Sequence, residues 1–275
     1  MIQIVGRDDA KALGEITYFA APRLQALGLV NHAFCTRSVR LKKVMYSPID
    51  LSAGSTGRLL LNRDVVARTF GFGTDQLITM DQVHGNDIWV IDGPLPPVDS
   101  SLNQRADALL TDQRDIAIAV LTADCVPIIL VDPNHRVIGI IHAGWRGTLL
   151  GIAPRVMDEM ARHFGTRPED LFVAIGPSVG GCCYEVDEAV MGPFRSSEWN
   201  WTAFSRPREK GKWYLNLARA NIDQMRGHGM RDDRCCWIRV CTVCNNDILF
   251  SYRAEGHGVG EQISFVQLWG RVKRG

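Results

Sequence analysis

The chain has 275 residues, of which 46% are hydrophobic and 22% are charged, as in an average compact soluble protein. Its 31 Lys and Arg residues against 30 Asp and Glu give a formal net charge of +1, without the basic excess of a nucleic-acid-binding protein. This composition excludes disordered, collagen-like and coiled-coil classes.

No part of the chain approaches the roughly 18 consecutive apolar residues of a membrane span. Residues 1–11 lack the basic segment and apolar run of a secretory signal, so we expect a cytoplasmic protein with no membrane partner. In that reducing compartment the 8 cysteines are better candidates for core residues, metal ligands or nucleophiles than for disulfides.

Hydrophobic periodicity and turn residues predict the elements along the chain. Strands are expected at 30–36, 88–91, 116–121, 126–131, 137–141, 171–175, 236–240 and 263–266. Helices are expected at 59–70, from about Gly151 with Pro154 in the first turn, and at 215–225.

The three central strands, 116–121, 126–131 and 137–141, are nearly continuous apolar runs. Such runs are typical of strands covered by another layer on both faces. Strands and helices mix without regular alternation, and no linker or repeat divides the chain. We therefore predict an α+β layered fold with a single domain over residues 1–275.

Three residues that can bind a soft or borderline metal stand beside predicted strands: His84, Cys125 and His142. Two imidazoles and one thiolate leave one tetrahedral position open, which is the pattern of a catalytic zinc site, although copper accepts the same ligands. The ligands are far apart and belong to no local metal motif. The alternative is that the histidines are hydrogen-bonded structural residues and that Cys125 is a small core residue.

Several longer motifs occur in fixed order through the chain. They are Gln82-Val83-His84-Gly85, Ala106 to Asp112, Leu121 to Pro127, His142 to Thr148, Ile175 to Ser178, Cys183 to Val186, Cys241-Thr242 and Phe250 to Arg253. Over roughly Ala33 to Gln267 this run resembles the YfiH/YlmD family of bacterial proteins, which is related to human laccase-domain-containing protein and has long been labelled multicopper polyphenol oxidase.

The resemblance implies a layered α/β/β/α fold and a single metal, usually zinc, held by His84, Cys125 and His142. It also implies purine nucleoside phosphorylase activity on adenosine, inosine, guanosine and methylthioadenosine, with accompanying adenosine deaminase activity. The expected partners are therefore small molecules, purine nucleosides and phosphate.

Roles for other side chains follow from this chemistry. Cys125 and His142 are the central catalytic candidates, and Asp124 is either a proton carrier or a turn residue at a strand end. Arg146, between glycines beside His142, is the best phosphate candidate because a guanidinium matches phosphate oxygens bidentately. Further substrate-binding candidates lie in family-like segments: Arg37, Arg63, Arg253 and His32.

Three other functions remain open at this point. Cys125 and His142 are also the nucleophile and base that a cysteine hydrolase needs, and some family members suggest a role in correcting peptidoglycan precursors. Copper-dependent polyphenol oxidation is poorly supported, because the whole chain has only 7 histidines for several copper centres. The last alternative is a metal-stabilised binding module without turnover.

The remaining cysteines give no metal motif. Cys241 and Cys244 form a CxxC without the second CxxC of a zinc ribbon, and the adjacent Cys182 and Cys183 are not expected to bind one metal together. We predict that six thiols are buried or loop residues: Cys182, Cys183, Cys235, Cys236, Cys241 and Cys244.

Overall fold

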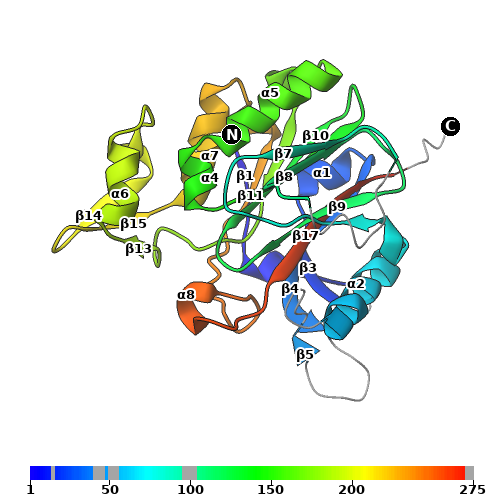
Figure 1. The fold of residues 1–275 in the computed structure, drawn as a ribbon, viewed down its shortest axis with the longest axis horizontal. Helices are drawn as coiled ribbons and strands as arrows, with labels where there is room; N and C mark the ends of the chain where they lie inside the picture. The colour runs from blue at the N-terminus through cyan, green and yellow to red at the C-terminus, as the bar shows by residue number, and fades with distance from the viewer. Residues whose placement is uncertain (14–15, 40–46, 49–55, 95–103, 270–275) are drawn as a thin grey trace.

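Two large β-sheets lie against each other in the centre of the protein (Figure 1). The structure is a computed structural model that describes residues 1–13, 16–39, 47–48, 56–94 and 104–269. Helices cover the outer face of each sheet, and the two faces that meet share one apolar core.

The first sheet, which we call sheet A, has seven strands. In spatial order they are β1 (Gln3–Val5), β16 (Cys235–Ile238), β12 (Phe172–Ile175), β10 (Val126–Asp132), β11 (Val137–Ala143), β8 (Ala108–Thr111) and β7 (Ile88–Ile91). β10 is antiparallel to both neighbours, whereas β16 runs parallel to β12 and β7 runs parallel to β8. This mixture of directions decides which loops meet at each edge of the sheet.

The second sheet, sheet B, is largely antiparallel. Its strands in order are β2 (Lys11–Leu13), β3 (Ile16–Phe19), β4 (Val30–Val39), β17 (Gln262–Leu268), β9 (Ala117–Thr122) and β6 (Leu77–Ile78), with β5 (Ser47–Pro48) beside β4. β17 is the C-terminal strand, yet it lies in the middle of the sheet between β4 and β9. A segment late in the sequence thus forms a central strand of the sheet.

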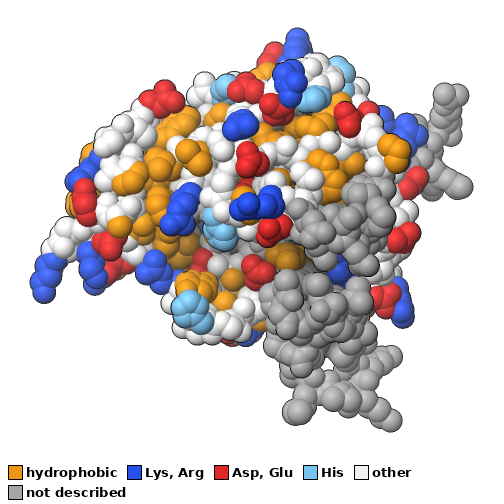
Figure 2. Space-filling view, in the orientation of Figure 1, with side chains coloured by type: hydrophobic (Ala, Val, Ile, Leu, Met, Phe, Trp, Pro, Cys, Tyr) orange, Lys and Arg blue, Asp and Glu red, His pale blue; other side chains and the backbone are white. Residues whose placement is uncertain are grey.

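The described helices include those on the two outer faces, one that packs into the core between the sheets, and one in a projecting part. They are α1 (Pro22–Ala26), α2 (Thr56–Phe70), α4 (Trp145–Leu149), α5 (Ile152–Phe164), α6 (Glu188–Arg195), α7 (Leu217–Gly227) and α8 (Tyr252–Glu255). α6 projects at the left of Figure 1 with a small sheet of β13 (Glu185–Val186), β15 (Lys212–Leu215) and β14 (Ser205–Arg208). Basic side chains gather at the tip of this small sheet in Figure 2.

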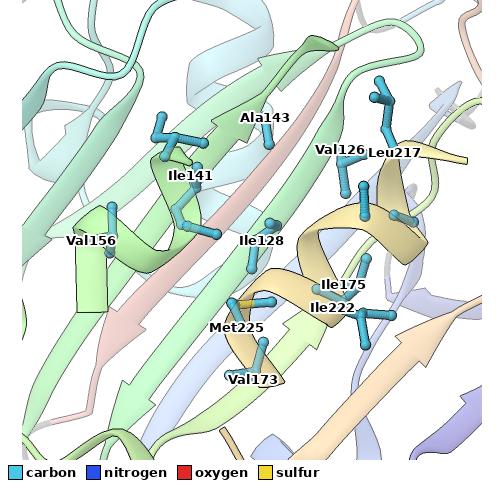
Figure 3. Packing of buried hydrophobic residues seen from close by; sticks show 14 of the residues in the cluster. Val126, Ile128, Ile141, Ala143, Val156, Val173, Ile175, Leu217, Ile222 and Met225 are labelled. Carbon is cyan, nitrogen blue, oxygen red and sulfur yellow. The ribbon is translucent and has the colours of Figure 1, made fainter. Parts of the chain in front are cut away.

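Alternating residues of one strand enter different cores, as the two-residue period of a β-strand requires. Val126 and Ile128 of β10 pack with α5 and α7 on the outer face of sheet A (Figure 3), whereas Ile129 packs between the sheets. On the far side of sheet B, Ala67 of α2 packs with Phe265 of β17. The predicted α/β/β/α layering is therefore confirmed.

The predicted elements are also present, with small shifts in their ends. β9, β10 and β11 are buried on both faces, as their apolar runs predict. α5 begins at Ile152 after Gly151, whose φ of 69° is left-handed, and Pro154 stands in its first turn. Among the described residues, no helix is long and apolar enough to cross a membrane.

Candidate metal centre

The loops at one end of the strands of sheet A carry the residues that the sequence singled out. β10 begins there at Val126, which pairs with Ala143 at the end of β11, and the starts of β8 and β7 lie at the same edge. We call this the Cys125 edge. It places Cys125 just before β10, His142 near the end of β11, and His84 in the loop before β7.

The three predicted metal ligands meet at this edge. One ligand atom each from His84, Cys125 and His142 can be chosen so that all lie within 4.8 Å of one another. The two imidazole rings are 4.7 Å apart between centroids and nearly perpendicular, at 89°. His142 is buried, Cys125 half-buried and His84 exposed, so the open side of the set faces outward through the His84 loop.

The loop that carries His84 is held in an uncommon conformation. His84 has a φ of 59°, in the left-handed region that few residues other than glycine adopt. A Cβ on Gly147, in α4, would lie 2.7 Å from the carbonyl oxygen of Gly85, so this glycine lets the His84 loop rest directly on the helix. Such local strain is typical of functional sites and needs support from the surrounding structure.

Asp107 supplies that support. Its carboxylate is fully buried and accepts the backbone N–H groups of His84, at 3.0 Å, and Gly85, at 2.6 Å. Its Oδ1 also lies 2.8 Å from Nδ1 of His142. A carboxylate that orients a metal-binding histidine in this way fixes the ring and leaves Nε2 for the metal.

The charges of the site reinforce one another. Burial raises the pKa of the Cys125 thiol, but the charge of His142 and hydrogen bonds from both imidazoles outweigh it and lower the pKa to about 6. Burial lowers the pKa of His142, but the thiolate of Cys125 and the hydrogen bond that His142 donates to Asp107 raise it to about 10. The pocket thus favours the thiolate form that binds metals.

Asp124 precedes Cys125 and acts as an anchor. Its φ is 95°, and its carboxylate accepts the hydroxyl of Thr242, the hydroxyl of Ser251 at 2.8 Å and the backbone N–H of Arg253 at 2.6 Å. Both carboxylate oxygens are therefore engaged. This arrangement favours the turn and positioning role that the sequence left open beside proton transfer.

Two guanidinium groups and a phenol lie near the ligands. The guanidinium of Arg253, in α8, lies over the Tyr184 ring at 5.2 Å, and that of Arg146, in α4, lies over Trp145 at 4.4 Å. Burial and the charge of Cys125 raise the pKa of Tyr184 to about 12, against the opposing charges of Arg253 and Arg146. In Figure 2, basic and histidine side chains gather between the places that α4 and α8 occupy in Figure 1.

The other substrate-binding candidates are engaged elsewhere. Arg37 pairs with Glu255 at 2.8 Å and stacks on Phe250. Arg63 is buried in α2 and donates to Thr79 and to the backbone of Leu77. His32 is buried in β4 and accepts the backbone N–H of Ala21 at 2.9 Å. Each of these side chains has hydrogen-bond partners within the protein, and its part in substrate binding stays a prediction.

Sequence reasoning did not single out Asp107 or Tyr184 as site residues. Asp107 directly precedes the buried strand β8, and an ionisable residue at such a position was the available signal. Tyr184 lies in the family-like motif Cys183 to Val186, but nothing in the sequence indicated a chemical role for its phenol. A cavity of about 480 Å³ elsewhere, lined partly by Arg206, Trp237 and Cys241, contains none of the three ligands.

The family model described as multi-copper polyphenol oxidoreductase laccase matches residues 31–269. The chain belongs to this family. It is 33% identical over 250 residues to a purine nucleoside phosphorylase of Deinococcus radiodurans, covering 90% of this chain and 93% of that protein. Purine nucleoside phosphorylase LACC1 of Mus musculus is 29% identical over 266 residues, which span 93% of this chain but only 59% of the mouse protein.

Solved structures share the fold. YfiH of Bacillus licheniformis superposes with a TM-score of 0.84 at 26% identity, covering 95% of this chain and all of that one. YlmD of Geobacillus stearothermophilus gives 0.83 at 26% identity, with 94% and 98% covered. These likenesses confirm the resemblance drawn from the sequence motifs and the layered fold that it implied.

Proposed function

We propose that the protein is a zinc-dependent purine nucleoside phosphorylase acting on adenosine, inosine, guanosine and methylthioadenosine, and that it also deaminates adenosine. The observation that carries the proposal is the convergence of His84, Cys125 and His142 within 4.8 Å at an outward-facing position. Several relatives named purine nucleoside phosphorylase support it.

The residues present fit a zinc ion. Two imidazoles and a thiolate are a ligand set that zinc accepts with one position left open, and the Asp107 carboxylate presents His142 in the required orientation. A zinc ion held there supplies Lewis-acid chemistry and lowers the pKa of water. Several copper centres are disfavoured, because the one histidine-containing cluster among the described residues has two imidazoles.

Phosphorolysis places two demands on the protein. A phosphate oxygen forms a bond to the anomeric carbon of the ribose while the bond from that carbon to the purine nitrogen breaks, so the purine leaves with the electron pair and takes up a proton. Arg146 and Arg253 are the cations that can bind the phosphate. The phenol of Tyr184 is kept protonated by its raised pKa of about 12 and can donate a hydrogen bond to a leaving group.

Deamination does not require these two arginines to bind phosphate. Water replaces the amino group at C6 of adenine, and ammonia leaves, without any phosphate. The two reactions therefore share the nucleoside and differ in their need for the arginines, which gives an internal comparison within one protein.

One observation favours a second candidate, a cysteine hydrolase. Cys125, His142 and Asp107 repeat the order of nucleophile, base and orienting acid found in triads, and the Cys125 thiol has a lowered pKa. However, a second imidazole from His84 also hydrogen-bonds the same sulfur. A nucleophile needs free space on that side, whereas a metal site needs the third ligand, so the geometry favours the metal site.

The test is a product assay on the purified, zinc-loaded protein. With adenosine and phosphate we expect adenine, ribose 1-phosphate and inosine, and without phosphate we expect inosine alone. Cys125→Ala should lose both reactions together with the zinc ion of the His84, Cys125 and His142 site, whereas Cys236→Ala, in the core between the sheets, should keep them. Absence of all three products from the loaded protein would refute the proposal, and turnover by zinc-free protein would favour the hydrolase.

A further inference from the structure

A second group of thiols lies beside the Cys125 edge. Cys182 and Cys183 stand in the turn between β12 and β13, and Cys241 and Cys244 stand in the loop after β16. Their four sulfur atoms lie within 4.8 Å of one another. All four are loop residues, as predicted, and the adjacency of Cys182 and Cys183 in sequence does not keep their sulfurs from meeting those of Cys241 and Cys244.

The topology of sheet A explains why distant cysteines meet. β12 and β16 are parallel neighbours, so the loops that follow them leave the sheet at the same edge. The loops then pair with each other: Thr242 donates its backbone N–H to Ser178, at 3.1 Å, and Ser178 donates to Val240, at 3.3 Å. A CxxC in one loop is thus brought against a cysteine pair in the other.

The spacing of the sulfurs fits one tetrahedral ion. With zinc–sulfur bonds of about 2.3 Å, the sulfurs of a regular tetrahedron lie about 3.8 Å apart. Cys244 Sγ is 3.7 Å from Cys182 Sγ and 3.4 Å from Cys183 Sγ. These distances are far beyond the roughly 2.05 Å of a disulfide bond, and all four cysteines are free.

The surroundings are built to hold a sulfur anion. Cys241 Sγ accepts the backbone N–H of Gly180 at 3.2 Å and a backbone N–H from Cys244, as thiolates in metal-binding loops do. A Cβ on Gly180 would lie 3.0 Å from Cys182 Sγ and 3.2 Å from Cys241 Cβ, so the glycine is needed for this close packing. Cys182 and Cys241 also line the neighbouring cavity, whose wall contains three arginines: Arg206, Arg219 and Arg239.

We propose that Cys182, Cys183, Cys241 and Cys244 bind a second zinc ion in a closed, four-thiolate structural site. With all four positions taken by protein sulfur, this ion has no place for substrate and acts as a brace between the two loops. A cluster of several irons is a poorer fit, because each iron takes its own thiolate and spreads the sulfurs apart. The proposal does not rest on the proposed function.

The brace has a consequence for the first site. Thr242, inside the CxxC, donates its hydroxyl to the carboxylate of Asp124, the residue before Cys125. Cys183 immediately precedes Tyr184, whose ring carries the Arg253 guanidinium. Loss of the second ion should therefore loosen both the Asp124 turn and the Tyr184 ring.

Zinc content by elemental analysis is the first test, on full-length protein purified with a reductant and zinc. We expect two zinc ions per chain for the natural protein and for Cys236→Ala, one for Cys125→Ala, one for Cys244→Ser, and none for the double variant Cys125→Ala/Cys244→Ser. A Cys125→Ala protein free of zinc would overturn the proposal.

The second test needs no change in the four-cysteine group. X-ray absorption at the zinc edge of Cys125→Ala should show four sulfur neighbours at about 2.3 Å and no imidazole nitrogen. Three results would each refute the assignment: nitrogen or oxygen neighbours of the zinc, bound iron in place of zinc, or a protein mass two units lower because of a disulfide among these thiols. Because Cys125→Ala keeps all four ligands, misfolding of the Cys244 variant cannot hide the answer.

Discussion

Replacing Asp107 by Asn tests the claim that this buried carboxylate builds the metal centre. The carboxylate accepts three hydrogen bonds, from the N–H groups of His84 and Gly85 and from the imidazole of His142. An amide has one oxygen, and its NH₂ group would face a donor. The substitution therefore leaves at least one buried donor without an acceptor and removes the charge that orients His142.

The expected magnitudes follow from these contacts. Loss of an orienting carboxylate weakens metal binding about 10- to 100-fold, which corresponds to roughly 1.4–2.8 kcal/mol. A hydrogen bond to a charged, buried partner contributes about 1.5–3 kcal/mol, so the metal-free variant should also lose stability of that order. Both losses should appear without any change in the ligands His84, Cys125 and His142.

Asp132 offers a matched control. It is fully buried at the end of β10 away from the Cys125 edge, and it accepts the N–H of Asn134 at 2.8 Å and lies 2.7 Å from Nδ1 of His135. Asp132→Asn should lower stability similarly but leave zinc affinity unchanged. Zinc dissociation constants from chelator competition and urea unfolding of both variants decide the matter; equal zinc affinity in Asp107→Asn and the natural protein would refute the reasoning.

Three other substitutions address separate features. Arg146→Ala should raise the KM for phosphate about 10- to 100-fold, from the loss of charged hydrogen bonds worth about 1.5–3 kcal/mol, and steady-state kinetics should show a much smaller change in deamination. Gly147→Ala should weaken zinc binding in the same chelator assay, because its Cβ would meet the Gly85 carbonyl at 2.7 Å. Burial, and then the charge of Lys11, lower the pKa of His32 to about 4, so the free energy of unfolding falls as the pH drops from about 6.5 toward 4. His32→Gln removes this titration and should reduce the fall by about 3 kcal/mol, as measured by urea unfolding.

The sequence predicts the layers better than the short elements. Continuous apolar runs mark β9, β10 and β11, because burial on both faces leaves no polar position in the pattern. α4 and β13 could not be predicted in this way. Each has five residues or fewer, too few to show a period, and each is held by tertiary contacts such as the hydrogen bond from Gln224 to the backbone of Thr148.

The candidate site likewise contains residues that the sequence could predict and residues that it could not. His84, Cys125 and His142 carry side chains whose chemistry is recognisable one at a time, so residue types and family motifs suffice to nominate them. The role of Asp107 exists only in relation to its partners, since a carboxylate becomes a metal-orienting group when it lies 2.8 Å from the imidazole of His142. The four-cysteine group was missed for the same reason: spacing in the chain says nothing about two loops that meet through parallel strands.

Both thiol sites depend on a single arrangement in sheet A. β10 runs against β11 and β12, and β16 runs with β12, so the start of one strand and the ends of three others share one edge. Loops from that edge carry Cys125 and the four-cysteine group, and the Asp124 carboxylate ties them together through Thr242. Strands packed on both faces are rigid, whereas the loops have less core to hold them. A closed metal site in those loops supplies the stiffness that an open metal site nearby requires to keep its ligands in place.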